Sequence, residues 1–126
     1  MTAIPTLPPD AIEISIPALA HHGAILRTLV SAMGADAGWC VDDIDDLKLA
    51  LSEVLSMMVG RDDIARVRVA FTVHGRQVTV RFRSEPIALL GPPDVLGAAI
   101  LAAVVDQVDW EDGGATLHKH SVDASA

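Results

Sequence analysis

The chain has 126 residues, the size of one ordinary domain, and is long enough to bury a core without disulfides or a structural metal. Hydrophobic residues make up 51% of it and aromatic residues only 3%, so we expect an aliphatic core. The formal net charge of -8 argues against non-specific binding to nucleic acid or to anionic membranes, because such binding needs a positive surface. A partner is therefore expected to be another protein.

Cysteine content and hydropathy indicate the compartment. The single cysteine, Cys40, cannot form an internal disulfide, and no charged start followed by an apolar run marks a signal peptide. No apolar run reaches the roughly 18 residues that span a bilayer. We expect a cytoplasmic protein without membrane association.

The N-terminal region is rich in proline. Residues 1–10 contain Pro5, Pro8 and Pro9 and lack periodicity, which predicts an extended arm before a domain over residues 11–122 and a tail over 123–126. The alternation of isoleucine with polar residues over 12–16 then predicts a half-buried strand that ends at Pro17.

Two helices follow. Apolar spacing predicts the first from about Leu19 to Met33, with Gly34 and Gly38 as stop signals. Asp42 is the expected N-cap of the second, which Gly60 closes. The aspartates at 42, 43, 45 and 46 then lie in its first turn, where the helix dipole favours carboxylates; a metal site is the alternative, but no further ligands are suitably spaced.

This second helix is the centre of the predicted fold. One face carries an apolar stripe, and a second face carries a single carboxylate, Glu53, between Leu49 and Met57. We expect the stripe to pack on a sheet. It consists of Leu47, Leu51, Val54 and Met58.

The remaining elements complete an α+β pattern. Alternation predicts a hairpin with strands over 67–73 and 78–82, a loop over 84–93, and a third helix that Asp94 caps and that runs to about Gln107. Because this helix is almost wholly apolar, we expect it to be buried. Two further strands, from Val108 and from Thr116 to His120, are joined by a turn at 112–114. The order predicts a two-layer sandwich: a mixed, mainly antiparallel sheet with about three helices on one face.

From Ile12 to Val122 the chain also carries an ordered set of motifs. They are an arginine, Arg27, on the first helix; Leu49-Ala50-Leu51-Ser52-Glu53 on the central helix; the strand from Gln77 to Pro86; Gly97; and the segments 105–110 and 113–117. In this order and spacing the chain resembles the anti-sigma-factor serine kinases of bacterial stress and sporulation switches. The resemblance implies the histidine-kinase-like (GHKL, Bergerat) ATPase fold.

The resemblance also implies a nucleotide site. Two positions on the central helix can be compared with the residues that the family has there. In the family a glutamate polarises the attacking group, and an asparagine four residues later holds magnesium against the phosphates. Glu53 matches the glutamate, but the asparagine position is Met57, whose thioether does not bind hard cations.

The nucleotide-facing loops depart further from the family pattern. The aspartate that binds the adenine amino group corresponds to Ser84, and Pro86 follows it where the family has a flexible loop. The phosphate-binding box keeps Gly97 but has Val95 at the earlier glycine, and only about ten residues replace the longer ATP lid. Thr116 keeps the adenine-side match.

These departures favour a regulatory protein that binds a sigma factor or an anti-anti-sigma (STAS) protein without ATP hydrolysis or phosphotransfer, and so without a cofactor. The family role of Arg27 is partner binding; the alternative is a solvated helix arginine. The alternative function is an active serine/threonine kinase that uses ATP and Mg²⁺ with Glu53 as general base. Otherwise Glu53 lies at the rim of a vestigial pocket or pairs with Arg81 or Arg83. Family members commonly form homodimers, and the sequence does not decide whether this chain forms one.

Other candidate sites are weaker. His118 and His120 point to one face of a strand and could share a metal, but a solvated pair is the usual outcome. Cys40 beside Trp39 is expected to pack in the core, since no base is placed to activate the thiol.

Overall fold

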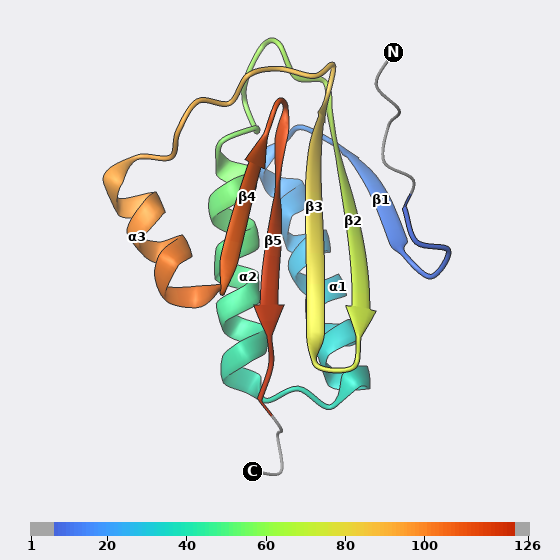
Figure 1. Ribbon diagram of the computed structural model, residues 1–126. Helices are drawn as coiled ribbons and strands as arrows, with labels where there is room; N and C mark the ends of the chain where they lie inside the picture. Colours follow the sequence, from blue (N-terminus) through green and yellow to red (C-terminus); the bar gives the residue numbers. More distant parts are fainter. Residues whose placement is uncertain (1–6, 123–126) are drawn as a thin grey trace.

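The computed structural model describes residues 7–122 as a sheet covered on one face by helices (Figure 1). The sheet has five strands in the order β1-β2-β3-β5-β4, and every pairing in it is antiparallel. The predicted α+β sandwich is therefore confirmed. In chain order the elements are β1 (Ile12–Pro17), η1 (Ala20–His22), α1 (Gly23–Ala37), α2 (Val41–Ser56), β2 (Arg66–His74), β3 (Gln77–Glu85), α3 (Val95–Val104), β4 (Gln107–Glu111) and β5 (Gly114–His120).

The core lies between the sheet and helices α1 and α2. The apolar stripe predicted on α2 faces it, since Leu47, Leu51, Val54 and Met58 are each at most 1% exposed. Alternate residues of the strands, among them Phe71 and Phe82, fill the opposite side. The sheet also requires a glycine at 114, because a Cβ there would collide with the carbonyl oxygen of Phe82.

Helix α1 begins and ends later than predicted. A short 3-10 turn, η1, precedes it, and it continues through Gly34 to Ala37. Gly34 is a packing position and not a stop signal, because a Cβ there would lie 2.6 Å from Cγ1 of Ile44 on α2. The second glycine signal is confirmed: Gly38 caps the helix with a left-handed φ of 75°.

The N-cap prediction for α2 was wrong. The cap residue is Cys40, and Asp42 lies inside the first turn. The prediction relied on a side-chain cap, but the cap position lies two residues before Asp42. Cys40 has the extended backbone of a cap residue, and its side chain makes no capping hydrogen bond. The helix itself ends at Ser56, and a turn leads to Gly60, whose φ is +76°.

Helix α3 departs most from the sequence expectation. Asp94 caps it as predicted, accepting a hydrogen bond of 2.6 Å from the Gly97 N–H. The helix ends at Val104, however, and most of it is not buried: Val95 is 89% exposed and Leu96 69%. It packs along α2 near the edge of the sheet, so only one of its sides meets the rest of the molecule (Figure 1).

The ends of the chain are described only in part. The predicted arm enters the described residues at Leu7, and the predicted tail over 123–126 lies outside them. Within residues 7–122, no helix combines the length and the apolar character that a bilayer crossing requires.

A buried ionic contact joins α2, α3 and β5. Lys119 on β5 is only 7% exposed and donates a hydrogen bond of 2.8 Å to the Val104 carbonyl at the end of α3. Its ammonium also lies 3.6 Å from Asp43 Oδ1 and 3.8 Å from Asp46 Oδ2 on α2. Asp43 Oδ2 in turn accepts hydrogen bonds from Cys40 Sγ, the Ser121 hydroxyl and the Val122 N–H. This contact holds the start of α2 against the end of the sheet.

We expect Asp43→Ala to lower the free energy of unfolding by about 1–3 kcal/mol, because three donors and Lys119 lose their acceptor. Urea denaturation measures the change, and Asp42→Ala is the matched control, since Asp42 is exposed and its side chain makes no hydrogen bond within residues 7–122. An equal loss in both variants would contradict the assignment.

The Asp43 contribution should also depend on pH. Partial burial alone raises the pKa of Asp43, but hydrogen bonds from Cys40, Val122 and Ser121, with the charge of Lys119, lower it below its ordinary value. A lowered folded-state pKa means that the carboxylate stabilises the fold above the unfolded-state pKa of about 3.9. The stability difference between wild type and Asp43→Ala should therefore shrink as the pH falls through the lowered pKa.

Candidate functional site

The positions predicted for the phosphate side of a nucleotide pocket meet between α2 and the start of α3. Glu53 and Met57 from α2 and Gly97 from α3 line one cavity there, together with Asp94. The cavity volume is about 60 Å³. Since ligand pockets measure roughly 300 Å³ or more, this space is several times too small for a drug-sized ligand.

Carboxylates surround the first turn of α3. A Cβ built on Gly97 would lie 3.0 Å from Asp94 Oδ1 and 3.2 Å from Glu53 Oε2, so both side chains point at this glycine. The Gly97 N–H already donates to Asp94. The positive end of a helix dipole commonly binds phosphate, but here a side chain of the same chain accepts from it and a second carboxylate lies beside it.

The structure also decides how Glu53 relates to the strand arginines. Arg81 makes a two-pronged contact with Glu111, at 3.1 and 3.2 Å, on the sheet face that the helices leave open. Within residues 7–122 no ion pair forms to Glu53 or to Arg83. The suggested pairing of Glu53 with Arg81 or Arg83 was therefore wrong, because those arginines lie across the sheet.

Met57 contributes an apolar wall. It is the C-cap residue of α2 and lines the cavity beside Glu53. A thioether is a poor ligand for magnesium, so this side of the cavity has one carboxylate and no second oxygen ligand from α2 at the asparagine position.

Ser84 lies at the end of β3 and is not among the residues that line the cavity. It is fully buried, and its hydroxyl accepts a hydrogen bond of 3.0 Å from the Ala88 N–H. Its own N–H donates to the Gly113 carbonyl at 2.7 Å. Both groups of Ser84 thus fix the loop between β3 and α3 against the turn between β4 and β5.

The structure does not bring Thr116 to the cavity. On β5 its neighbours Ala115 and Leu117 are fully buried and face the helices. Thr116 therefore points to the opposite face, where the strand register places it between Arg81 and Asp109.

Arg27 lies between α1 and α2 and is half-buried. Its guanidinium donates a long hydrogen bond of 3.4 Å to the Ser52 hydroxyl on α2. Within the described residues it forms no ion pair, so its charge is not neutralised locally. Leu49 on the same helix as Ser52 is 44% exposed.

The histidines of β5 do not form a metal centre. His118 Nε2 lies 2.9 Å from Asp109 Oδ2 on the open sheet face. Hydrogen bonds from Gln107 and from His118 lower the pKa of that aspartate. Over residues 7–122, no three His, Cys, Asp or Glu side chains are grouped to hold a metal ion.

Sequence reasoning missed the second role of Asp94. It was predicted as a helix cap, but its place beside Glu53 was not foreseen. The available signal was its position three residues before Gly97, at the start of the helix that carries the phosphate-binding box.

Several bacterial proteins are similar to this chain over most of its length. Serine-protein kinase RsbW of Bacillus cereus strain AH187 is 31% identical over 131 residues, which cover 86% of this chain and 82% of the relative. This chain belongs to the RsbW family. RsbW of Bacillus thuringiensis strain Al Hakam and RsbW of Bacillus anthracis are each 28% identical with the same coverage. No protein-family model matches the chain.

A solved structure supports the RsbW-like fold. The crystal structure of the RsbU and RsbW domains of Rv1364c from Mycobacterium tuberculosis superposes with a TM-score of 0.66 and 20% identity. The match covers 93% of this chain and 34% of that longer chain. At this identity the likeness concerns the fold, which agrees with the family assignment made from the relatives.

We expect Ser84→Ala to destabilise the protein by about 1–2 kcal/mol, because the partly buried Ala88 N–H loses its acceptor. Ser56→Ala is the control, since the exposed Ser56 hydroxyl bonds only the nearby Glu53 carbonyl. Chemical denaturation of the two variants measures both changes. A Ser84→Ala protein as stable as the wild type would show that the hydroxyl does not fix this loop.

Proposed function

We propose that this member of the RsbW family is a regulatory protein that binds a sigma factor or an anti-anti-sigma STAS protein, without nucleotide-dependent activity. The observation that carries the proposal is the small size of the cavity at Glu53, about 60 Å³, with the Asp94 and Glu53 carboxylates beside Gly97 at its edge. The family assignment supports the choice of partner class.

The electrostatics of the cavity argue against a triphosphate. Phosphoryl transfer depends on positioning and on cations that neutralise developing negative charge. Here Glu53 and Asp94 place two carboxylates at the helix start, and no Lys or Arg lines the cavity. Met57 stands where the family has its magnesium ligand, so this position supplies no oxygen to a cation that would offset the repulsion.

Arg27 is the proposed partner-binding residue. An Arg guanidinium without an ion pair in the described residues is a strong hydrogen-bond donor, and Leu49, one turn before its partner Ser52 on α2, adds exposed apolar area, the combination that interface hot spots show. Arg27 does not line the cavity at Glu53, so partner binding through it needs no nucleotide.

An active serine kinase is the second candidate, because Glu53 is retained and the relatives are serine-protein kinases. On this alternative α3 must move away from α2 to admit ATP and Mg²⁺, and Glu53 acts as the general base. Transfer of labelled phosphate from ATP to a cognate STAS protein, abolished in Glu53→Gln, would establish this candidate and reject the first.

Calorimetric titration with MgATP tests the proposal directly. We expect no binding of this chain at millimolar nucleotide. RsbW of Bacillus cereus strain AH187, titrated under the same conditions, is the comparison protein. We expect Met57→Asn to remain without binding, because it restores one ligand and leaves both the small volume and the two carboxylates at Gly97 unchanged. Micromolar binding by the wild-type chain would contradict the proposal.

Arg27→Ala should weaken the complex with a sigma factor or STAS partner by about tenfold, close to 1.4 kcal/mol. Partners are first captured from the native cytosol and identified by mass spectrometry, and affinities are then measured with the purified partner. Arg61→Ala is the control, because within residues 7–122 the Arg61 guanidinium forms its ion pair with the nearby Asp63. Equal affinities of the Arg27→Ala and Arg61→Ala proteins would remove Arg27 from the interface.

A further inference from the structure

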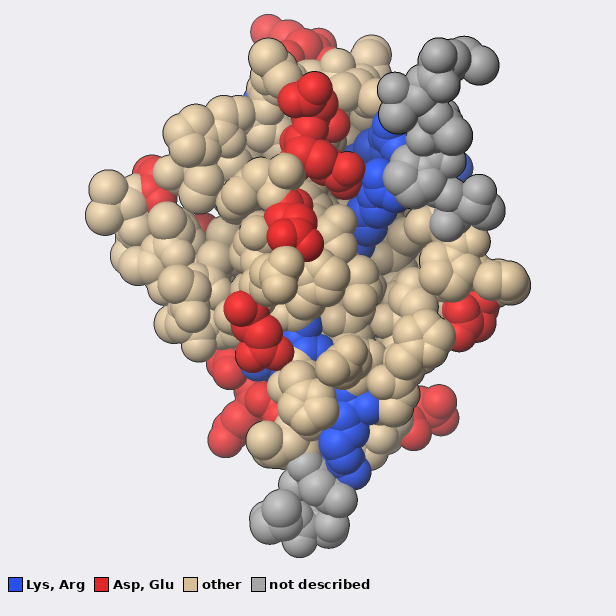
Figure 2. Space-filling model, viewed as in Figure 1, with Lys and Arg blue, Asp and Glu red and all other residues tan. Residues whose placement is uncertain are grey.

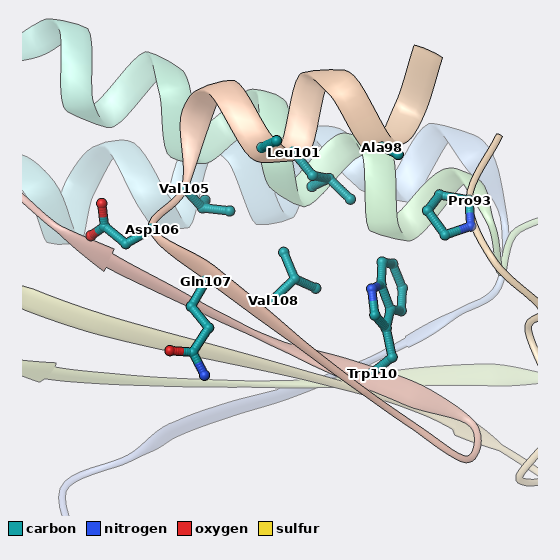
Figure 3. Close-up of a pocket in the computed structure, with 9 residues that line it drawn as sticks. Pro93, Ala98, Leu101, Val105, Asp106, Gln107, Val108 and Trp110 are labelled. Atoms are coloured by element: carbon teal, nitrogen blue, oxygen red, sulfur yellow. The ribbon is translucent and has the colours of Figure 1, made fainter. Parts of the chain in front are cut away.

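A second, larger cavity lies on the other side of α3. It is a groove of about 330 Å³ between α3 and β4 (Figure 3). Leu101 and Val105 enter it from above, and Val108 and Trp110 from β4 below. Pro93 closes one end, and Asp106 and Gln107 lie at the other. The volume accommodates roughly two groups of the size of a benzene ring.

The groove opens at an edge of the sheet. Among the described strands β4 pairs only with β5, so its other side offers backbone donors and acceptors to an added strand. Val108 and Trp110 point under α3, and the alternate residues Gln107, Asp109 and Glu111 point to the open face. A strand beside β4 would therefore place every second side chain in the groove.

Apolar surface continues beyond the groove. Val95 and Leu96 on α3 are among the most exposed hydrophobic residues, and Trp110 is 42% exposed. Leu89, in the loop that leads to α3, is 73% exposed. Leu89 and Trp110 also line a neighbouring pocket together, and exposed apolar side chains gathered in this way are typical of a protein interaction surface.

Charge selects among possible occupants. The sequence contains no Lys or Arg between Arg83 and Lys119, while this segment supplies Asp106, which lines the groove, and Asp109 and Glu111 on the open face of β4. On that face Asp109 pairs with His118 and Glu111 with Arg81, so an added basic side chain would join existing ion pairs. The surface over α3 accordingly shows acidic and uncharged atoms (Figure 2). A second copy of the chain would bring the same negative charges to the contact, so like-charge repulsion disfavours self-association here.

We propose that the groove and the edge of β4 bind an extended segment of a basic partner protein as an additional strand. Apolar side chains of the segment fill the groove beneath α3, and alternating Lys or Arg side chains lie on the open face beside Asp109 and Glu111. Backbone pairing with β4 supplies affinity, and the apolar–basic alternation supplies specificity. Arg27 does not line this surface.

Selection of random twelve-residue peptides displayed on phage tests the proposal without a known partner. The full chain is the bait, and the tightest peptide is then measured by fluorescence anisotropy against two variants. Ala102→Arg adds a cation and bulk at the groove, whereas Ala103→Arg makes the same change at the neighbouring exposed position that does not line it. Circular dichroism confirms that both variants are folded.

We expect the enriched peptides to alternate apolar and basic residues and to bind at least tenfold more weakly to Ala102→Arg. Binding to Ala103→Arg should change less than twofold, and the affinity should fall as salt is raised. Hydrogen exchange should show new protection of β4 amides in the complex. Absence of enrichment, acidic peptides, equal effects of the two variants, or binding without protection of β4 would each overturn the proposal.

Discussion

The central constraint on this molecule is the convergence of two carboxylates on the first turn of α3. Asp94 accepts the Gly97 N–H, and Glu53 reaches the same glycine from α2. Because α3 packs along α2, the two helices leave only about 60 Å³ between them. A helix N-terminus that could bind an anion is thus already occupied by an anion of the chain itself. The proposed loss of nucleotide chemistry follows from this packing more than from any single missing residue.

The rest of the fold keeps this arrangement in place. The fully buried stripe of α2 fixes that helix on the sheet, and Lys119 ties the end of α3 to the start of α2. Ser84 holds the connection that leads into α3 against the Gly113 turn. With so little space at the site between α2 and α3, the surfaces proposed to act are two others: Arg27 on α1, which contacts α2, and the groove between α3 and β4. The first carries an unpaired cation and the second is bordered by acids, so the two suit partners of different charge.

Local patterns were enough to predict most of the architecture. Period-two alternation located the hairpin of β2 and β3, and helical spacing identified the buried stripe of α2, because side-chain periodicity reports directly which face is covered. Predicted helix boundaries were wrong where tertiary packing overrode a local signal. Gly34 lies inside α1, and Ile44 of α2 packs against it.

The burial of α3 was overpredicted for a related reason. Apolar composition shows that a helix needs a partner, but it does not show that this helix lies at a sheet edge with one side uncovered. The residues around Gly97 could be anticipated by resemblance, whereas Thr116 could not be placed, since a one-residue change of register exchanges the two faces of a strand.

A crystal structure grown with millimolar Mg²⁺ and a non-hydrolysable ATP analogue would test the central claim most directly. The account predicts that α3 stays packed on α2, with Asp94 still bonded to the Gly97 N–H and no ordered nucleotide between Glu53 and Gly97. An ordered triphosphate with its cation at that position, and α3 displaced from α2, would contradict it.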